Sequence, residues 1–434
     1  MKTNIIGIIV FSLGLLYAFC SRNAMQQNNE KNIGTVQDTT ETFSMKNIDF
    51  SLATDLYRKQ KDTLALTKAE KACADKVNDL AFMMLHQMSK DQTDSSFVVS
   101  PMSLNCAIAM TGNGASGKTL QEIEQLVGPI ADANSFFKKY YASLPHNDYS
   151  NCGIYNYLAV NSKYPINEEF TNKIETVYDA CVKSIDFTHP QVAKQINDWF
   201  CLKLQEESQN VAIKPDSQTS LFLANVLDFR AFWASPFNSQ FTYNKEFTND
   251  NGQVLEVPMM YCQERTCIYT ENGSFQAVSL PYLGCCYRML FVLPKNEKLS
   301  TFTNTMTSNS FLNILSSLKR TTVTLRLPRF RCVCDMGVKK MLTKTISSAF
   351  DVKKANFNAI CSLPTWIDEI SQNTSIEVTE QGTKARSITV ESFLTKSESF
   401  DPEFIATHPF LYFVYDEVTQ AILFAGQFCG NGAI

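Results

Sequence analysis

The sequence has little histidine and no paired cysteine motif. Its 434 residues include only 4 histidines, and none of its 14 cysteines forms a Cys-x-x-Cys pair. Protein zinc sites are commonly built from such pairs or from histidines at short spacing. We therefore expect neither a metal nor another cofactor, and we expect most of the cysteines to be small buried hydrophobic residues.

The motifs of common hydrolases are also missing. The chain has no Gly-x-Ser-x-Gly turn for a nucleophile and no His-Glu-x-x-His pair for zinc. Its net charge of −4 gives no electrostatic reason to expect a nucleic acid partner. Nothing in the sequence therefore indicates an enzyme or a nucleic-acid-binding protein.

One phosphate-binding pattern is present, in the segment "GNGASGKT" from Gly112 to Thr119. In a nucleotide-binding loop of this pattern, Lys118 would contact the β- and γ-phosphates and Thr119 would hold magnesium. Such a loop follows a buried strand, but the preceding "SPMSLNCAIAM" has apolar residues at helical spacing. We interpret the segment as a turn between two helices with Thr119 as a capping residue. A nucleotide-binding protein remains an alternative.

The amino terminus has the composition of an export signal. An apolar run from Ile5 to Phe19 follows Lys2 and ends at Cys20, and it is short for a membrane-spanning helix. Residues 1–20 are therefore predicted to be a signal peptide similar to those of bacterial lipoproteins, with Cys20 lipidated after cleavage. Phe19 departs from the small residue usual there, so simple cleavage near Cys20 and an uncleaved anchor remain alternatives. We expect the protein at the cell envelope or surface, or secreted.

The rest of the chain divides into a tether and one domain. Residues 21–61 are polar without an apolar period and are predicted to form a flexible linker, with an ordered extension as the alternative. Residues 62–434 show no comparable break and are expected to form a single domain. Helical periodicity comes early and strand patterns come late, which favours an α+β fold with large antiparallel or mixed sheets. Helices are predicted at 69–88 and 119–127, and strands at 95–100, 274–282, 287–294, 321–332, 409–416 and 421–428.

Seven segments, taken together and in order, resemble the serpin family. They are "SSFVVSPMSLNCAIAMTGNGASGKTLQEI", "LANVLDFRAFWASPF" followed by "EVPMM", "AVSLPYLG", "MLFVLP", "LRLPRF", "IEVTEQGTKA", and "HPFLYFVYD" with "ILFAGQF". The resemblance spans about residues 64 to 430. It implies a monomer of the serpin fold, in which helices surround a large central mixed sheet, and an exposed reactive loop at about 380–405. It also implies inhibition of serine proteases by a suicide-substrate mechanism.

In this family a protease cuts the reactive loop, which then inserts into the central sheet as a new strand. Side chains alternate between the two faces of a strand. Small residues fall on the face that would turn inward after the hinge residues Glu380 and Gly382: Thr383, Ala385, Ser387 and Thr389. Lys384, Arg386, Ile388 and Val390 occupy the opposite face, where charge can stay in water. Arg386 and Ile388 depart from the very small residues usual in inhibitory hinges, and Glu391 falls on the inward face.

Counting places the bond that the protease would cut. Inhibitory members are cut sixteen residues after the glutamate at the start of the hinge, which from Glu380 reaches Lys396, with Ser397 on the leaving side. A lysine before the bond suits trypsin-like proteases, whose specificity pocket holds a carboxylate. Phe393 and Leu394 lie just upstream and would suit chymotrypsin- or elastase-like proteases.

The resemblance also implies a region that controls opening of the sheet. Ser100, Ser103 and Asn225 belong to it, and Gln372 stands where the family usually has a histidine. Trp233 would pack at the top of the sheet, where insertion begins. A non-inhibitory serpin that serves as a binding protein is the main alternative function.

Replacing Cys20 tests the lipid anchor. Cys20→Ser removes the thiol that would carry the lipid, so we expect the protein to move from the membrane fraction to the soluble fraction of the cell. Fractionation followed by immunoblotting measures this. An unchanged membrane association would refute lipidation at Cys20.

Overall fold

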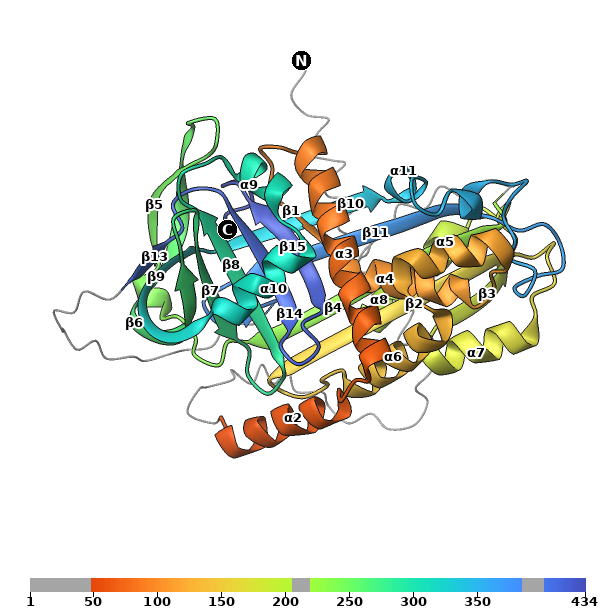
Figure 1. Ribbon diagram of the computed structural model, residues 1–434, viewed down its shortest axis with the longest axis horizontal. Helices are drawn as coiled ribbons and strands as arrows, with labels where there is room; N and C mark the ends of the chain where they lie inside the picture. The colour runs from red at the N-terminus through yellow and green to blue at the C-terminus, as the bar shows by residue number, and fades with distance from the viewer. Residues whose placement is uncertain (1–47, 205–218, 385–401) are drawn as a thin grey trace, which may run out of the picture. The chain divides into compact units, whose positions relative to one another are not determined.

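The computed structural model describes residues 48–204, 219–384 and 402–434 (Figure 1). Within these residues the chain forms two β-sheets with helices packed against them, which confirms the predicted α+β class. None of the helices in these ranges is long and apolar enough to cross a membrane.

Helices dominate the first part of the described chain. The long helix predicted at 69–88 is present as α3, and that predicted at 119–127 is present as α5. The helices are α2 (Phe50–Thr63), α3 (Lys68–Asp91), α4 (Pro101–Gly112), α5 (Gly117–Val127), α6 (Ile130–Ser143), α7 (Glu168–Tyr178), α8 (Val192–Leu204), α9 (Leu299–Thr305), α10 (Ser308–Ser317) and α11 (Lys339–Leu342).

Nine described strands form one sheet, in the order β1-β15-β14-β8-β7-β6-β9-β13 with β5 paired to β6 (Figure 1). The strands predicted at 95–100, 274–282, 287–294, 409–416 and 421–428 all belong to it. Its members are β1 (Phe97–Val99), β5 (Tyr243–Thr248), β6 (Val254–Glu271), β7 (Phe275–Pro281), β8 (Tyr287–Pro294), β9 (Lys319–Pro328), β13 (Glu403–Ile405), β14 (Phe410–Asp416) and β15 (Ile422–Phe428).

The second sheet is mixed and contains the long strands β11, β4 and β2 (Figure 1). Its order is β10-β11-β12-β4-β2-β3. β11 runs parallel to β4, and β2 runs parallel to β3, while the β10–β11 and β2–β4 pairs are antiparallel. Its strands are β2 (Ser150–Asn161), β3 (Cys181–Ile185), β4 (Leu221–Phe232), β10 (Phe330–Gly337), β11 (Ile367–Val378) and β12 (Gly382–Thr383).

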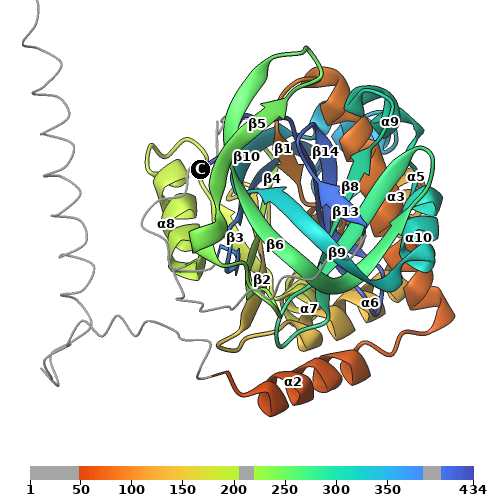
Figure 2. The same cartoon turned by 90° about the vertical axis from the view of Figure 1, so that its left-hand side faces the viewer.

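Helix α4 lies in the core and contacts both sheets, through β4 of the mixed sheet and β15 of the other. Every residue of α4 is buried. The hydroxyl of Ser100 caps its first turn, and Pro101 follows at the first helical position, where its missing N–H costs nothing. Helix α8 packs instead on the outer face of the mixed sheet, where Val192, Ile196 and Phe200 form an apolar cluster with residues of β2 and β4 (Figure 2).

Two predicted boundaries are wrong. The segment 321–332 is not one strand, because it divides into β9 and β10, which belong to different sheets. The division falls at Arg329, whose backbone N–H bonds to the carbonyl of Pro258 outside either ladder. The segment predicted as a loop, 380–405, also contains strands at both of its ends, because Gly382–Thr383 and Glu403–Ile405 are strands.

The predicted linker 21–61 is wrong at its carboxyl end, because α2 begins at Phe50. Asp49 caps this helix by accepting a bond from the N–H of Leu52 at 2.9 Å. Of the residues in α2 only Ala53 and Gln60 are buried. Its apolar residues Leu52, Ala53, Leu56 and Tyr57 recur at helical spacing but span less than two turns, which is a short signal beside the polar residues that precede it.

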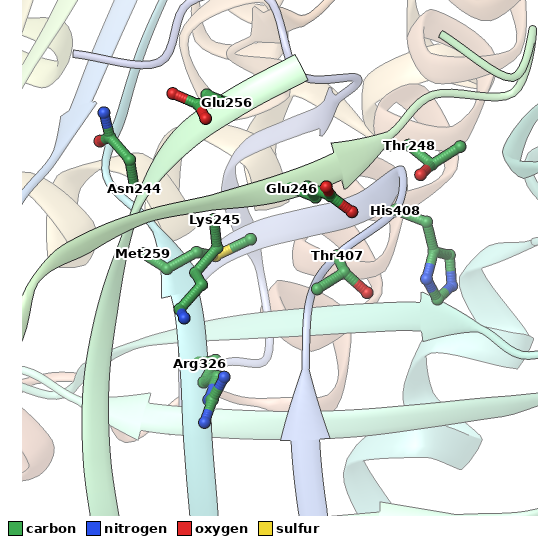
Figure 3. A pocket seen from close by; sticks show the side chains of 9 residues that line it. All are labelled: Asn244, Lys245, Glu246, Thr248, Glu256, Met259, Arg326, Thr407 and His408. Carbon is green, nitrogen blue, oxygen red and sulfur yellow. The ribbon is translucent and has the colours of Figure 1, made fainter. Parts of the chain in front are cut away.

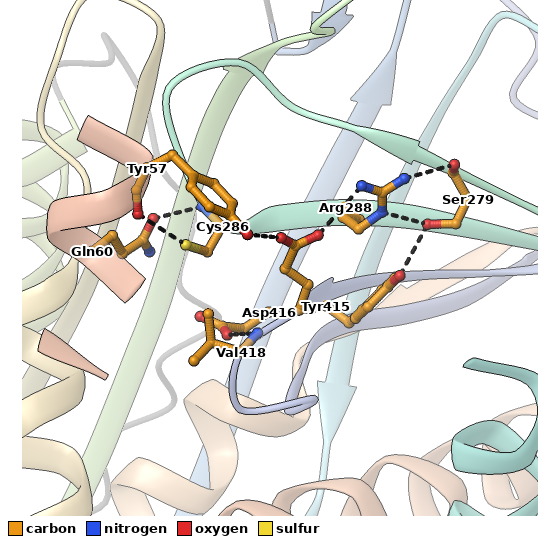
Figure 4. A network of polar contacts seen from close by, with 9 residues as sticks. Tyr57, Gln60, Ser279, Cys286, Arg288, Tyr415, Asp416 and Val418 are labelled. Atoms are coloured by element: carbon orange, nitrogen blue, oxygen red, sulfur yellow. Dashed lines mark hydrogen bonds and ion pairs between the residues drawn. The ribbon is translucent and has the colours of Figure 1, made fainter. Parts of the chain in front are cut away.

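Helix α2 is held by a few specific contacts (Figure 4). Ala53 packs against Tyr149 and Leu283 in a small apolar cluster. Tyr57 donates a hydrogen bond to Glu417, whose carboxylate also lies 3.3 Å from Arg288. The side-chain oxygen of Gln60 accepts a bond from the N–H of Cys286 at 2.7 Å.

A charge at the buried position of α2 should detach the helix. Ala53→Glu would bury an unpaired carboxylate between Tyr149 and Leu283, at a cost of several kcal/mol. We expect limited proteolysis within 50–63 to become at least about tenfold faster, because cleavage follows local opening. Thr54→Glu, at the exposed neighbouring position, is the matched control and should change little. Equal cleavage rates in the two variants would contradict this packing.

Candidate functional site

Two neighbouring strands of the mixed sheet pair over only part of their length. β11 and β4 are joined directly from Ile367–Gln372 to Leu221–Asn225. Beyond these ranges no ladder joins residues 226–230 of β4 to β11 in the part of the chain that the structure describes. At the far end, β12 (Gly382–Thr383) lies between the two strands and is antiparallel to both. We call the interval between residues 373–377 of β11 and 226–230 of β4 the sheet gap.

The turn that leads from β11 into β12 is fastened to the end of β4 and the segment after it. The backbone N–H of Trp233 donates to the carbonyl of Gln381 at 2.8 Å, and its indole N–H donates to the carbonyl of Thr379 at 2.9 Å. The N–H of Phe237 donates to the carbonyl of Glu380 at 2.8 Å. Trp233, expected at the top of the sheet, is fully buried there and holds this turn with both its backbone and its side chain.

The side chain of Glu380 is also held by two polar contacts. It accepts a hydrogen bond from the hydroxyl of Thr242 at 2.7 Å and lies 3.5 Å from the guanidinium of Arg329. Glu380 is buried, so both contacts compensate a carboxylate that has lost most of its water. The start of the hinge is therefore fixed to three separate segments of the chain.

Gly382 and Thr383 lie very close to β4 and to buried aromatic side chains. A Cβ on Gly382 would lie 2.0 Å from the carbonyl oxygen of Ala231, so only glycine allows the chain to approach β4 this closely. Thr383 is 1% exposed, and its hydroxyl lies 2.6 Å from that of Tyr282, which stacks on Trp233. Burial raises the pKa of Tyr282 far above its usual value, so the phenol stays protonated and can share this bond. The side chain of Thr383 thus points inward.

Lys384 faces the other side of the sheet but is not in water. Its side chain is 20% exposed, and its Nζ lies 3.7 Å from Oδ1 of Asp228 on β4. Asp228 is 2% exposed, and the Nε of Arg230 lies 3.2 Å from its other oxygen. In the described state Lys384 is therefore paired with a buried carboxylate, whereas its expected exposure to water in an inserted strand stays a prediction. Its φ of 48° marks the point where the chain turns away from extended geometry.

The residues expected to control sheet opening meet where the direct β11–β4 ladder ends. The amide of Gln372 forms two bonds with the backbone of Ser100: its oxygen accepts from the N–H at 3.0 Å, and its NH2 donates to the carbonyl at 2.7 Å. The hydroxyl of Ser100 donates to the carbonyl of Leu423 at 2.8 Å. Gln372, which stands in place of a histidine, therefore joins β11 to α4, while Ser100 joins α4 to β15.

Asn225 continues this polar region on β4. Its amide NH2 donates to Asn156 of β2, and Asn156 in turn donates to the carbonyl of Tyr178 at 3.0 Å. The side-chain oxygens of Asn225 and Ser103 are buried without a hydrogen-bond partner among the described residues. Buried polar atoms are costly when unpaired, so this place can gain stability from a new polar neighbour.

The segment with the phosphate-binding pattern has no room for a phosphate, because neighbouring side chains pack against it. Thr119 lies inside α5, is fully buried, and accepts a bond from the N–H of Asn356 at 3.1 Å. A Cβ on Gly114 would lie 2.0 Å from Ile360, so side chains fill the space a phosphate would need. The prediction that Thr119 caps the helix is also wrong, because Ser116 occupies the cap position.

Other places in the described chain offer no competing chemistry. No group of three or more histidine, cysteine or acidic side chains in the described residues could hold a metal ion. The described cysteines are all unpaired and mostly buried. A cavity of about 650 Å³ lies on the other sheet (Figure 3), and its lining consists of Asn244, Lys245, Glu246, Thr248, Glu256, Met259, Arg326, Thr407 and His408. It shares no residue with the hinge or the sheet-opening region.

Several predicted site residues lie outside the described residues. They are Lys396 and Ser397 of the predicted reactive bond, Phe393 and Leu394 beside it, Ala385, Ser387 and Thr389 of the hinge, and Cys20. The structure thus brings together Glu380, Gly382 and Thr383 with Trp233 at one end of the sheet gap. At its other end lie Ser100, Ser103, Asn225 and Gln372.

Sequence analysis missed two side chains of this site. Tyr282 is the last residue of the strand predicted at 274–282 and carried no signal of its contact with Thr383. Asp228 did carry one, because it is the charged residue in the otherwise nonionic stretch "LANVLDF", and a charge on a buried strand requires a partner.

Comparison with known proteins identifies the family. Residues 75–430 match the family model "Serpin (serine protease inhibitor)". A serpin-like protein of Thermococcus kodakarensis is 30% identical over 82% of this chain and 85% of its own length. Human neuroserpin is 26% identical over 81% of this chain and 90% of its own length.

Solved structures show the same fold. The thermophilic serpin tengpin in its native state superposes with a TM-score of 0.76 at 23% identity, covering 84% of this chain and 95% of tengpin. Human thyroxine-binding globulin, solved in complex with thyroxine, gives a TM-score of 0.75 at 22% identity over 83% of this chain and 98% of its own. The family match covers most of the chain, and the fold agrees with it. The protein is therefore a member of the serpin family of serine protease inhibitors.

Proposed function

We propose that this serpin inhibits serine proteases as a suicide substrate. The observation that supports this best is the position of β12, where Thr383 occupies the mouth of the sheet gap with its side chain turned inward. The protease serine would attack the carbonyl of Lys396, forming an ester and releasing the amino group of Ser397. The freed loop would then extend β12 into the sheet gap while the protease is still attached.

The sheet gap can supply the driving force. Each residue that enters it exchanges hydrogen bonds with β4 on one side and β11 on the other. At roughly 0.5–1.5 kcal/mol net per bond, about ten such bonds give on the order of 10 kcal/mol. The uncleaved protein would then be a kinetically trapped state, whose lifetime depends on the barrier to opening. The protein itself provides a peptide bond and this stored free energy, and the protease provides the catalysis.

The proposed site of action lies outside the cytoplasm. The predicted signal in residues 1–20 supports export, with the lipid on Cys20 as an anchor to the envelope or surface. The proposed partners are trypsin-like proteases, because Lys396 precedes the bond. Phe393 and Leu394 make chymotrypsin- or elastase-like proteases secondary targets.

The lysine before the bond should set the specificity. Lys396→Ala removes the charge that the trypsin pocket binds, a contact worth about 1.5–3 kcal/mol, so inhibition of trypsin should weaken well over tenfold. The second-order rate of trypsin inactivation measures this. Inactivation of a chymotrypsin-like protease, which would use Phe393 or Leu394, is the control and should persist. Unchanged trypsin inhibition would place the reactive bond elsewhere.

The inward position of Thr383 should decide between inhibition and simple cleavage. Thr383→Arg would displace residue 383 from its place against Tyr282 in the uncleaved protein, and insertion would then have to bury the unpaired guanidinium there, at a cost of several kcal/mol. We expect cleavage at the same bond but little complex with trypsin that survives SDS, and recovered protease activity. The matched control is Thr383→Val, which keeps the size and loses only the hydroxyl contact, and it should still inhibit.

An SDS gel of the protein mixed with a protease also separates this function from its alternative. If the unsubstituted protein yields only cleaved chains with a range of serine proteases, it is a non-inhibitory serpin, and a binding role becomes the better explanation. If Thr383→Arg forms as much stable complex as Thr383→Val, the inward face of the hinge does not control insertion.

A further inference from the structure

Strand β5 forms a ladder on one side only, where it pairs with β6. Thr248 shows which backbone groups of β5 point the other way, because its N–H donates to the carbonyl of Thr407 at 2.9 Å. In an antiparallel pair this direction alternates from residue to residue. The N–H and C=O groups of Asn244 and Glu246 therefore also point away from β6. In the part of the chain that the structure describes, no hydrogen bond is made to them there.

The cavity of about 650 Å³ follows this free edge (Figure 3). Its lining includes Asn244, Glu246 and Thr248, the three residues of β5 whose backbone groups point outward. Its volume falls within the range of about 300–1,000 Å³ that is usual for ligand pockets. The carbonyl of Thr407 already pairs with the edge at Thr248, so the cavity leaves the rest of the edge open to another extended chain.

One face of β5 presents positive charge to the cavity. Lys245 is opposite Val257 of β6, and Tyr261, further along the same face of β6, is opposite Arg326 of β9. Because directly opposite side chains share a face, Lys245 and Arg326 lie on the same side of the sheet. Figure 3 shows both beside Met259. The guanidinium of Arg326 lies 5.1 Å from the ring centre of Tyr261, and neither cation has an ion-pair partner among the described residues.

The other face of β5 presents negative charge. Glu246 is directly opposite Glu256 of β6, so the two carboxylates share a face. Like charges in this position destabilise a sheet, and no described cation pairs with either carboxylate. The free edge is thus basic on one face and acidic on the other.

These charges argue against a second copy of the chain as the partner of this edge. Antiparallel pairing of two β5 strands that uses the outward groups of both Asn244 and Glu246 has two registers within the strand. One places Lys245 opposite Lys245, and the other places Glu246 opposite Glu246. Both bring like charges together, so a strand with a different sequence fits better.

We propose that the free edge of β5 binds an extended segment of a partner protein in which acidic and basic residues alternate. The segment would form hydrogen bonds with the backbone of Asn244 and Glu246 as an added strand. Its acidic side chains would lie beside Lys245 and Arg326, and its basic side chains would lie beside Glu246 and Glu256. This site belongs to the sheet that does not contain the sheet gap, and it is independent of the proposed protease inhibition.

Two peptides of equal composition test the alternation. When extended, the capped peptide Lys-Glu-Lys-Glu-Lys-Glu has all its acidic side chains on one face, whereas Lys-Lys-Lys-Glu-Glu-Glu does not. We expect the alternating peptide to bind at least about fivefold more tightly, as measured by isothermal titration calorimetry at low salt. Its binding should weaken strongly at about 1 M salt, where the Debye length is about 3 Å.

Substitutions at residue 244 test the backbone contacts. Asn244→Pro removes one outward N–H without breaking a bond to β6, and edge strands tolerate proline at such positions. The alternating peptide should bind about two- to tenfold more weakly, as expected for one lost hydrogen bond. Asn244→Ala keeps the N–H and is the matched control, which should bind normally. Thermal unfolding checks that both variants fold.

Substitution of the lysine tests the charges. Lys245→Glu should weaken binding of the alternating peptide at least about fivefold, because the basic face loses one cation and gains an anion. Lys319→Glu changes an exposed lysine outside the cavity and should have little effect. If Asn244→Pro does not fold, this pair of exposed substitutions still tests the site.

Three results would overturn the proposal. Equal binding of the two peptides would show that alternation is not recognised. Normal binding to both Asn244→Pro and Lys245→Glu would place any peptide site elsewhere. Absence of binding would mean that Lys245 only keeps the edge from pairing with other strands. Trypsin inhibition by the unsubstituted protein tests the proposed function separately, so either proposal can fail alone.

Discussion

The rest of the site depends on the ladder between β11 and β4, which is complete at one end and missing at the other. Six residues of β11, from Ile367 to Gln372, span the part joined to β4, and β12 enters where that pairing is absent. Strands that run side by side without a ladder leave backbone groups that a third strand can satisfy. The short β12 begins to do so, because Gly382 can approach β4 where a larger residue would collide with Ala231. The fold thus contains both an acceptor for a strand and the first two residues of that strand.

Polar side chains stand at both limits of the sheet gap, and they act differently. At the mouth, Trp233 binds the turn before β12 through backbone and side chain, which fixes the point of entry. At the closed end, Gln372 and Asn225 connect the joined strands to α4 and β2. Because glutamine keeps both a donor and an acceptor at every physiological pH, this junction needs no titrating group. A histidine in its place would make the same contact dependent on pH.

Much of this arrangement was predictable from the sequence, and the exceptions have physical causes. The alternation after Glu380 assigns Thr383 to the inward face of an inserted strand, and in the described state its side chain is already buried against Tyr282, because side-chain direction on a strand is a local property. Helix α2 was missed because its apolar residues span less than two turns and its contacts with Tyr149, Leu283 and Glu417 come from distant segments. The division between β9 and β10 at Arg329 was missed for the same reason, since only tertiary structure separates two adjoining strand-like segments. The partner of Lys384 likewise depends on β4, more than 150 residues earlier in the chain (384 − 228 = 156).

The position of the polar junction divides the proposed insertion into two stages of different cost. Residues 384–388 would lie opposite residues 230–226 of β4, where no described ladder has to be broken. The next residue, Thr389, would arrive between Asn225 and Gln372, the last directly paired residues of β4 and β11. Further insertion must separate these strands beside the buried oxygen of Asn225 that has no partner among the described residues. If the loop inserts as proposed, the first stage would proceed without opening the sheet and the second would require it, which would place the barrier to insertion at this junction.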